Sequence, residues 1–148
     1  MQAGMLPAQA RSVFPEIFGR YKRMNASPNA SMTMDDVLAE FRASGALLEG
    51  HFKLSSGRHS GHYLQCASVL MRPSRAARLA AAVVANIPSD VLDRVECVVS
   101  PAMGGIIIGQ EVARVMDTDA LFLERPEGVF HLRRGFALEP GAKVLMVE

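Results

Sequence analysis

A turn of small residues joins an apolar run to a helical pattern in the middle of the chain, in the stretch ECVVSPAMGGIIIGQEVA (residues 96–113). Gly104 and Gly105 let a ligand approach the backbone, and the N-terminus of the following helix offers unpaired N–H groups and a positive dipole end. These are the features of a phosphate-binding turn. The spacing is not G-x-G-x-x-G, and no Lys-Ser/Thr follows as in a P-loop. Glycines that serve packing alone would give the same pattern, so both interpretations stay open on this motif by itself.

A polar loop between two short apolar runs is the second candidate, in FKLSSGRHSGHYLQ (residues 52–65). Its hydroxyl, guanidinium and backbone groups could bind a planar polar ligand. The residues concerned are Ser55, Ser56, Arg58, His59 and Ser60. A solvated turn would have the same composition. His51, His59 and His62 straddle this turn without helical spacing, and no cysteine or carboxylate completes a ligand set, which argues against a metal site made of the three.

A charged segment, ERPEGVFHLRRGF (residues 124–136), is the third candidate. Arg125, Arg133 and Arg134, with His131 nearby, could clamp phosphate oxygens. Two glutamates in the same segment weaken its basic field, and an exposed hairpin is the simpler explanation for Arg133 and Arg134 taken singly. No serine or cysteine sits in a nucleophile-elbow context, and Cys97, in the middle of an apolar run, is best explained as a core residue.

Helical patterns alternate with short apolar runs, which predicts an α/β fold with a mostly parallel sheet. Thr33 is a suitable N-cap for a first helix, and a second helix begins at Pro73 and stops before Pro88. Strands are predicted at 51–54, 62–71, 95–100, 120–124 and 143–148, with a further helix at 106–116.

The bulk composition indicates one globular domain and excludes several classes of partner. The chain has 148 residues, 49% of them hydrophobic and 21% charged, and a formal net charge of +1. That charge gives no general attraction to nucleic acid or acidic membranes. No apolar run reaches the length of a membrane span, and the two cysteines lack metal-type spacing. We therefore expect a reduced, cytoplasmic protein, with a disordered leader at 1–31 and a folded domain at 32–148.

The three motifs in this order, followed by KVLMVE at 143–148, resemble those of the orotate phosphoribosyltransferases, from Met34 to Glu148. The resemblance implies the Rossmann-like, mostly parallel sheet of the type I phosphoribosyltransferase fold under a small N-terminal hood. The hood and an orotate hairpin would occupy 32–71 and the first part of the core 72–148. It also implies a magnesium-dependent homodimer with shared active sites. Such an enzyme transfers ribosyl phosphate from phosphoribosyl diphosphate to orotate in pyrimidine (UMP) biosynthesis.

The resemblance assigns roles to particular residues. Tyr63 and Leu64 would line the base, and the turn of Ala102, Met103, Gly104 and Gly105 would cradle diphosphate. The 124–136 segment would be the mobile catalytic loop that reaches a neighbouring subunit, with Arg125 and His131 as its catalytic residues. Glu148 would be the first acid of the donor-binding loop. No residue is assigned as a metal ligand.

Several departures from the family pattern accompany the resemblance. The family's loop of the type R-K-x-x-K-x-H-G has no lysine here, which leaves Arg125 as the substitute cation. Met103-Gly104 stands where many members have Tyr-Lys, and Ser55 where many have Lys. Of the family's E-D-x-x-T-T-G loop only Glu148 is present, so residues 1–148 alone are expected to be inactive. The alternatives are a related regulatory or nucleotide-binding protein, or a transferase for another base.

Overall fold

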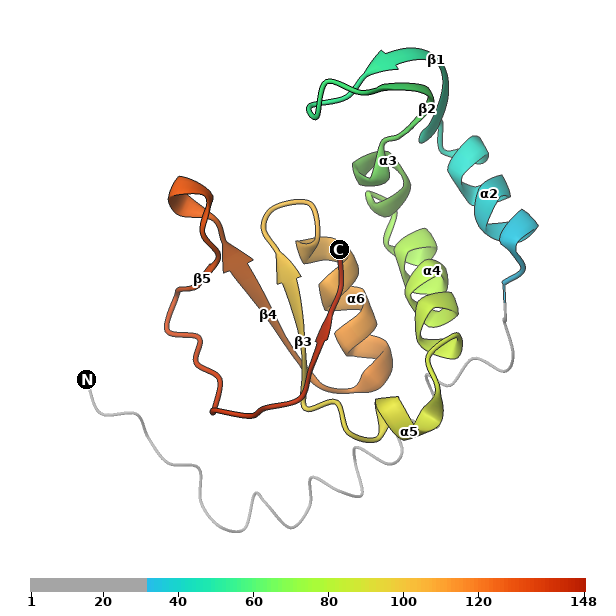
Figure 1. Ribbon diagram of the computed structural model, residues 1–148. Coiled ribbons are helices and arrows are strands. Elements are labelled where there is room, and N and C mark those ends of the chain that lie inside the picture. Colours follow the sequence, from blue (N-terminus) through green and yellow to red (C-terminus); the bar gives the residue numbers. More distant parts are fainter. Residues whose placement is uncertain (1–31) are drawn as a thin grey trace. The chain divides into compact units, whose positions relative to one another are not determined.

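The computed structural model describes residues 32–148, which form a four-stranded sheet, a separate two-stranded hairpin and the helices between them (Figure 1). The leader predicted for 1–31 lies outside the described residues. Four strands form the main sheet in the order β5-β4-β3-β6: His131–Leu132, Asp119–Glu124, Cys97–Pro101 and Val144–Met146. β3 runs parallel to both β4 and β6, and β5 runs antiparallel to β4. The predicted α/β fold with a mostly parallel sheet is confirmed.

The helix α6 (Ile106–Met116) packs on β3 and β4 and against α4 (Pro73–Ala85). Pro73 occupies the first turn of α4, where its missing N–H costs no hydrogen bond. The core between these elements is made of small and β-branched side chains, namely Ala80, Val98, Val112, Ala113 and Val147. Such small side chains let the helices lie close to the sheet.

The helix α2 (Met34–Ala43) begins at the predicted cap. Thr33 Oγ1 accepts a hydrogen bond from the Asp36 amide at 3.2 Å, and Asp36 Oδ2 accepts one from the Thr33 amide at 2.9 Å. This reciprocal capping box satisfies two amides that the helix itself cannot pair. Phe41 and Val37 then pack on a second buried cluster made of Ala46, Val69, Leu70, Ala76 and Leu79.

The strands β1 (Leu47–Lys53) and β2 (His59–Leu64) form the antiparallel hairpin. The second strand was predicted to run through residue 71, and this is wrong: residues 66–70 form the helix α3 (Cys66–Leu70). The strand stops where the Gln65 amide bonds the Ala46 carbonyl, after which Val69 and Leu70 are buried in the core. A short apolar run cannot be assigned to strand or helix by its pattern alone. A further short helix, α5 (Ser89–Leu92), follows Pro88.

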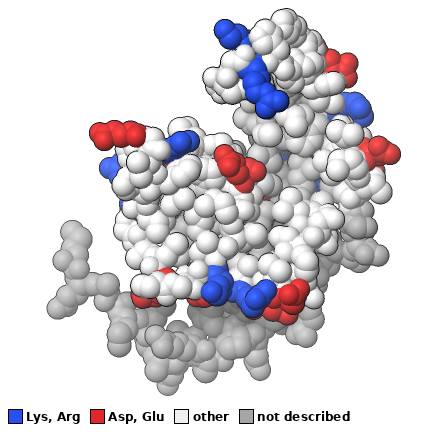
Figure 2. All heavy atoms as spheres, viewed as in Figure 1, with Lys and Arg blue, Asp and Glu red and all other residues white. Residues whose placement is uncertain are grey.

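No helix within residues 32–148 has the length and apolar character needed to cross a membrane. Figure 2 shows the basic and acidic side chains of the described residues interspersed on the face in view, without a broad area of one sign.

Glu40 ties α2 to α4 by accepting hydrogen bonds from Arg75 Nε at 2.9 Å and from the Arg78 guanidinium. The bonds from Arg78 and then Arg75 hold the pKa of this carboxyl below its ordinary value, against the opposing effect of burial. A depressed folded-state pKa gives stability that is present above the unfolded pKa and is lost as the pH falls through the folded pKa. The tie between the two helices is therefore acid-sensitive.

We expect Glu40→Gln to lower the melting temperature at neutral pH and to change it little in acid below the folded pKa. Thermal melts from pH 7 to pH 2 would measure the difference. The matched control is Glu139→Gln, since Glu139 makes no ion pair among residues 32–148. A loss that is equal at all pH values would contradict a role for the ionised carboxylate.

Candidate functional site

The turn after β3, residues 102–105, leaves backbone donors unpaired. The Ala102 amide donates a hydrogen bond to the Leu123 carbonyl at 2.7 Å, and the Gly105 amide donates one to the Pro101 carbonyl at 3.0 Å. Between them, the Met103 and Gly104 amides donate no hydrogen bond to any group within residues 32–148. Both residues are exposed, and α6 begins directly after the turn. The turn thus offers two free N–H groups beside a helix N-terminus, an arrangement that suits a phosphate oxygen.

The two glycines of this turn do different things. A Cβ on Gly105 would lie 2.9 Å from both Cδ and the carbonyl oxygen of Pro101, so Gly105 is required for packing. A Cβ on Gly104 would meet nothing within 4 Å. Gly105 is therefore needed for packing, whereas Gly104 faces open space that a ligand could occupy.

Glu148 lies at the same edge of the sheet as Gly104. The Val147 amide bonds the Val99 carbonyl at 2.9 Å, which continues the parallel pairing of β6 with β3 beyond Met146. Because the carboxyl ends of parallel strands meet at one edge, the residues that follow β3 and β6 come together. This edge is where ligands bind in open α/β sheets.

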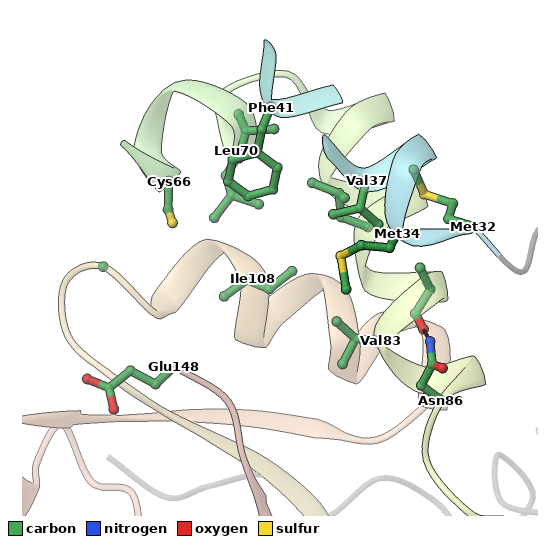
Figure 3. Close-up of a pocket in the computed structure, with 14 residues that line it drawn as sticks. Met32, Met34, Val37, Phe41, Cys66, Leu70, Val83, Asn86, Ile108 and Glu148 are labelled. Atoms are coloured by element: carbon green, nitrogen blue, oxygen red, sulfur yellow. Dashed lines mark hydrogen bonds between the residues drawn. The ribbon is translucent and has the colours of Figure 1, made fainter. Parts of the chain in front are cut away.

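Gly104 and Glu148 both line one cavity of about 570 Å³. Figure 3 shows Glu148 at one end of it and Asn86 at the other, with Ile108 of α6 between them. Glu148 is its only charged lining residue among the described residues, and the remaining lining is mostly apolar. The other lining residues are Met32, Met34, Val37, Phe41, Cys66, Val69, Leu70, Leu79, Ala82 and Val83. The cavity therefore combines an apolar wall with backbone donors and one carboxylate at its end.

Tyr63 and Leu64, predicted to line the base, do not line this cavity. They lie at the end of β2, with 40% and 50% of their surface exposed. The Tyr63 ring is 5.7 Å from the Phe52 ring, so the aromatic side chain is held within the hairpin. Cys66, two residues beyond Leu64, does line the cavity. Cys66 could not be predicted from the sequence, because its place in the cavity wall depends on the turn from β2 into α3.

Arg125 and His131, the predicted catalytic residues, also lie outside the cavity lining. Arg125 Nε donates to the Gly128 carbonyl at 2.9 Å, and its guanidinium lies 5.0 Å from the centre of the Phe130 ring. His131 is exposed in β5, opposite Glu124 of β4. The charge of Arg125 is therefore held by a carbonyl and an aromatic face, with no carboxylate partner among residues 32–148.

Arg133 and Arg134 have a different arrangement. Arg133 Nη1 donates to Glu124 Oε2 at 3.0 Å, and Arg134 Nε donates to Glu124 Oε1 at 2.7 Å. The bond from Arg134 lowers the pKa of the Glu124 carboxyl, and the same bond raises the pKa of Arg134. Glu124 thus joins the two ends of the loop and balances the charge of both arginines. Cys97 is buried in β3, and burial raises the pKa of its thiol, as suits a core residue.

The chain has close relatives in sequence, although no family model matches it. It is 68% identical to the orotate phosphoribosyltransferase of Erythrobacter litoralis over 117 residues, which are 79% of this chain and 61% of that protein. It is 67% identical to the enzyme of that name from Novosphingobium aromaticivorans, over 79% of this chain and 60% of that protein. The chain therefore spans about three fifths of the length of these curated relatives.

Solved structures share the fold. The orotate phosphoribosyltransferase of Aeropyrum pernix aligns with a TM-score of 0.54 and 23% identity, over 66% of this chain and 56% of that one. The UMP synthase of Leishmania donovani aligns with a TM-score of 0.57 and 14% identity, over 98% of this chain and 29% of that one. At these identities the solved structures show only that the fold is shared. By its sequence, the chain is similar to proteins named orotate phosphoribosyltransferase, over about three fifths of their length.

Proposed function

We propose that the protein carrying this sequence transfers ribosyl phosphate from phosphoribosyl diphosphate to orotate, with orotidine monophosphate and diphosphate as products. The observation that carries the proposal is the 68% identity to a protein named orotate phosphoribosyltransferase. The meeting of Gly104 and Glu148 at one cavity supports it, because the donor needs groups for both diphosphate and ribose. This reaction would form the nucleotide in pyrimidine biosynthesis.

The chemistry suits a site without a nucleophile. As the bond to diphosphate breaks, positive charge grows on the ribose and negative charge on the leaving group. A protein accelerates such a reaction by aligning the partners and stabilising the separated charges. The free amides of Met103 and Gly104, with the N-terminus of α6, would bind the diphosphate oxygens. The Glu148 carboxylate would accept hydrogen bonds from the ribose hydroxyls and would favour the positive charge on the ring.

Arg125 is the loop cation that we assign to the leaving diphosphate. Its guanidinium has only the Gly128 carbonyl and the Phe130 ring as partners among the described residues, whereas Arg133 and Arg134 are both bound to Glu124. A guanidinium without a carboxylate partner can turn to a phosphate oxygen without breaking an ion pair. His131, two residues before Arg133, would act as a proton donor to the diphosphate from the same loop.

Magnesium fits this arrangement as part of the proposal. Mg²⁺ keeps several waters and binds through one or two carboxylates and substrate phosphates. Glu148 is the one carboxylate at the cavity within residues 32–148, and it would hold the ion together with the diphosphate oxygens. The ion would supply charge neutralisation on the leaving group.

We also propose a cytoplasmic homodimer with shared sites, in which the 124–136 loop contacts the partner subunit. Val129 and Phe130, at the tip of this loop, are 59% and 46% exposed, which suits a segment that contacts another surface. Orotate and phosphoribosyl diphosphate would be its ligands, without nucleic-acid or membrane partners.

A base-competition panel tests the choice of orotate. The complete protein, supplied with the donor and magnesium, is expected to consume orotate and to leave uracil, hypoxanthine and adenine unchanged. Preferred turnover of another base would overturn the assignment to orotate. Donor binding without turnover of any base would favour the regulatory or nucleotide-binding alternative.

Gly104→Ala is expected to raise the KM for the donor by about tenfold, or about 1.4 kcal/mol, at an unchanged melting temperature. The added methyl group meets no protein atom within 4 Å, so folding is unaffected, but it occupies space that the diphosphate must enter. Steady-state kinetics of the complete protein would measure the KM for the donor. Gly61→Ala is the matched control and should leave the KM for the donor unchanged. That glycine also faces open space, but it lies in the hairpin and not in the cavity lining. A donor KM that stays unchanged in Gly104→Ala would contradict the assigned diphosphate cradle.

A further inference from the structure

Two histidines face each other on the β1–β2 hairpin. His51 Nε2 lies 2.5 Å from His59 Nδ1, the ring centres are 4.7 Å apart, and the ring planes meet at 31°. Both residues are exposed. At this separation the N–H of one ring donates a hydrogen bond to the unprotonated nitrogen of the other. The lone pair of that acceptor nitrogen therefore points toward the partner ring.

An irregularity in the hairpin produces this pairing. Glu49 lies opposite His62 and Phe52 opposite Ser60, so the two residues 50 and 51 oppose the single residue 61. Such a β-bulge re-aims the side chain that it carries. His51 thereby becomes a diagonal neighbour of His59, close enough for two imidazoles to meet. His62 lies three positions beyond His59 on the same strand, and the alternation of side chains directs it to the opposite face.

We propose that His51 and His59 form a two-imidazole binding site for a borderline divalent transition metal such as Ni²⁺ or Zn²⁺. Neutral imidazole is the protein ligand that these ions favour. Metal–nitrogen bonds of about 2.0–2.1 Å at a tetrahedral angle place the two nitrogens about 3.3 Å apart. The pair must therefore open by less than about 1 Å from the 2.5 Å separation, which exposed side chains can do by small rotations. The ring that donates the hydrogen bond moves its proton through solvent to its other ring nitrogen, so both facing nitrogens present lone pairs to the ion.

The surroundings predict a site of modest affinity, with coordination positions that the protein leaves open. No group of three or more His, Cys, Asp or Glu side chains gathers around a common point within residues 32–148, so water or an added ligand completes the shell. Lys53 lies opposite His59 in the strand register, and Arg58 precedes it in the chain, so neighbouring positive charge opposes the ion. His51 and His59 do not line the cavity at Glu148, so metal binding is measured by itself and does not depend on turnover.

Calorimetric titration of the reduced, complete protein with Ni²⁺ tests the proposal. We expect one saturable site per chain, and Zn²⁺ is expected to displace the bound Ni²⁺. Loss of either imidazole removes chelation, so His51→Ala and His59→Ala should each weaken binding by about 100-fold. His62→Ala is the matched control and should bind as the unmodified protein does. Cys66→Ser should also bind normally, since Cys66 belongs to the cavity wall.

Imidazole-ring NMR provides a second measurement on the same samples. Stoichiometric Zn²⁺ is expected to shift the ring resonances of two histidines and to leave those of His62 and His131 in place. Melting temperatures of the alanine variants check folding, and His51→Gln and His59→Gln replace them if either unfolds. Equal weakening by His62→Ala, retained binding after loss of His51 or His59, or the absence of saturable binding would each overturn the proposal.

Discussion

Arg125→Ala is expected to lower kcat of the complete protein by about 10²–10³-fold, the usual cost of removing one group that stabilises transition-state charge. The reason is the environment of this guanidinium, which interacts with the Gly128 carbonyl and the Phe130 ring and has no carboxylate partner within residues 32–148. The side chain is exposed, so the melting temperature should change little. Steady-state kinetics with saturating orotate and donor would separate the effect on kcat from that on KM.

Arg133→Ala and Arg134→Ala are the matched controls in the same loop. Each removes an equal charge, but from an arginine that Glu124 already binds, so each should reduce kcat far less than Arg125→Ala. Exposed ion pairs contribute little to stability, and the fold should survive both changes. If Arg134→Ala abolished activity while Arg125→Ala left it intact, the assignment of the loop cation would be wrong.

Gly109→Ala is expected to destabilise the protein by about 1–2 kcal/mol, which lowers the melting temperature by about 2–8 °C in a protein of this size. A Cβ at this position would lie 2.6 Å from Ser100 Oγ and 2.8 Å from Ser100 Cβ, in the buried contact between α6 and β3. The helix and the strand must move apart to admit it. The better helix propensity of alanine offsets about 1 kcal/mol of this cost.

A double-mutant cycle with Ser100→Gly isolates the contact. Removing the serine side chain makes room for the new methyl group, so Ser100→Gly together with Gly109→Ala should be more stable than the sum of the single changes predicts. Gly104→Ala is the control for a glycine that faces open space, and it should melt normally. Strict additivity of the two changes would show that the close approach at Ser100 is not the cause.

Local signals in the sequence predicted the elements that position the site. The Thr33 cap, the start of α4 at Pro73 and the helix after Gly105 all follow from nearest-neighbour chemistry, and all three are present. The alternation of helices with apolar runs predicted the mostly parallel sheet. A parallel sheet in turn brings the residues after β3 and β6 to one edge, which is why Gly104 and Glu148 line one cavity.

Features that depend on distant parts of the chain could not be predicted in the same way. Residues 66–70 are apolar enough for strand or helix, and burial against α2 and α4 decides for helix. Apolar residues of α4 such as Ala82 and Val83 suit a core or a cavity wall equally, so their place in the cavity lining could not be predicted. The bulge that joins His51 to His59 is a property of strand register, which residue types alone leave undetermined.

We propose that the turn after β3 and the acid after β6 bind one phosphoribosyl donor. The direct measurement is formation of orotidine monophosphate from orotate and phosphoribosyl diphosphate by the complete protein, compared with its Glu148→Gln variant at equal melting temperature. We expect turnover by the unmodified protein and, in the variant, a loss of at least about tenfold in kcat/KM for the donor, which corresponds to about 1.4 kcal/mol. Absence of orotidine monophosphate, or an unchanged kcat/KM in Glu148→Gln, would contradict it.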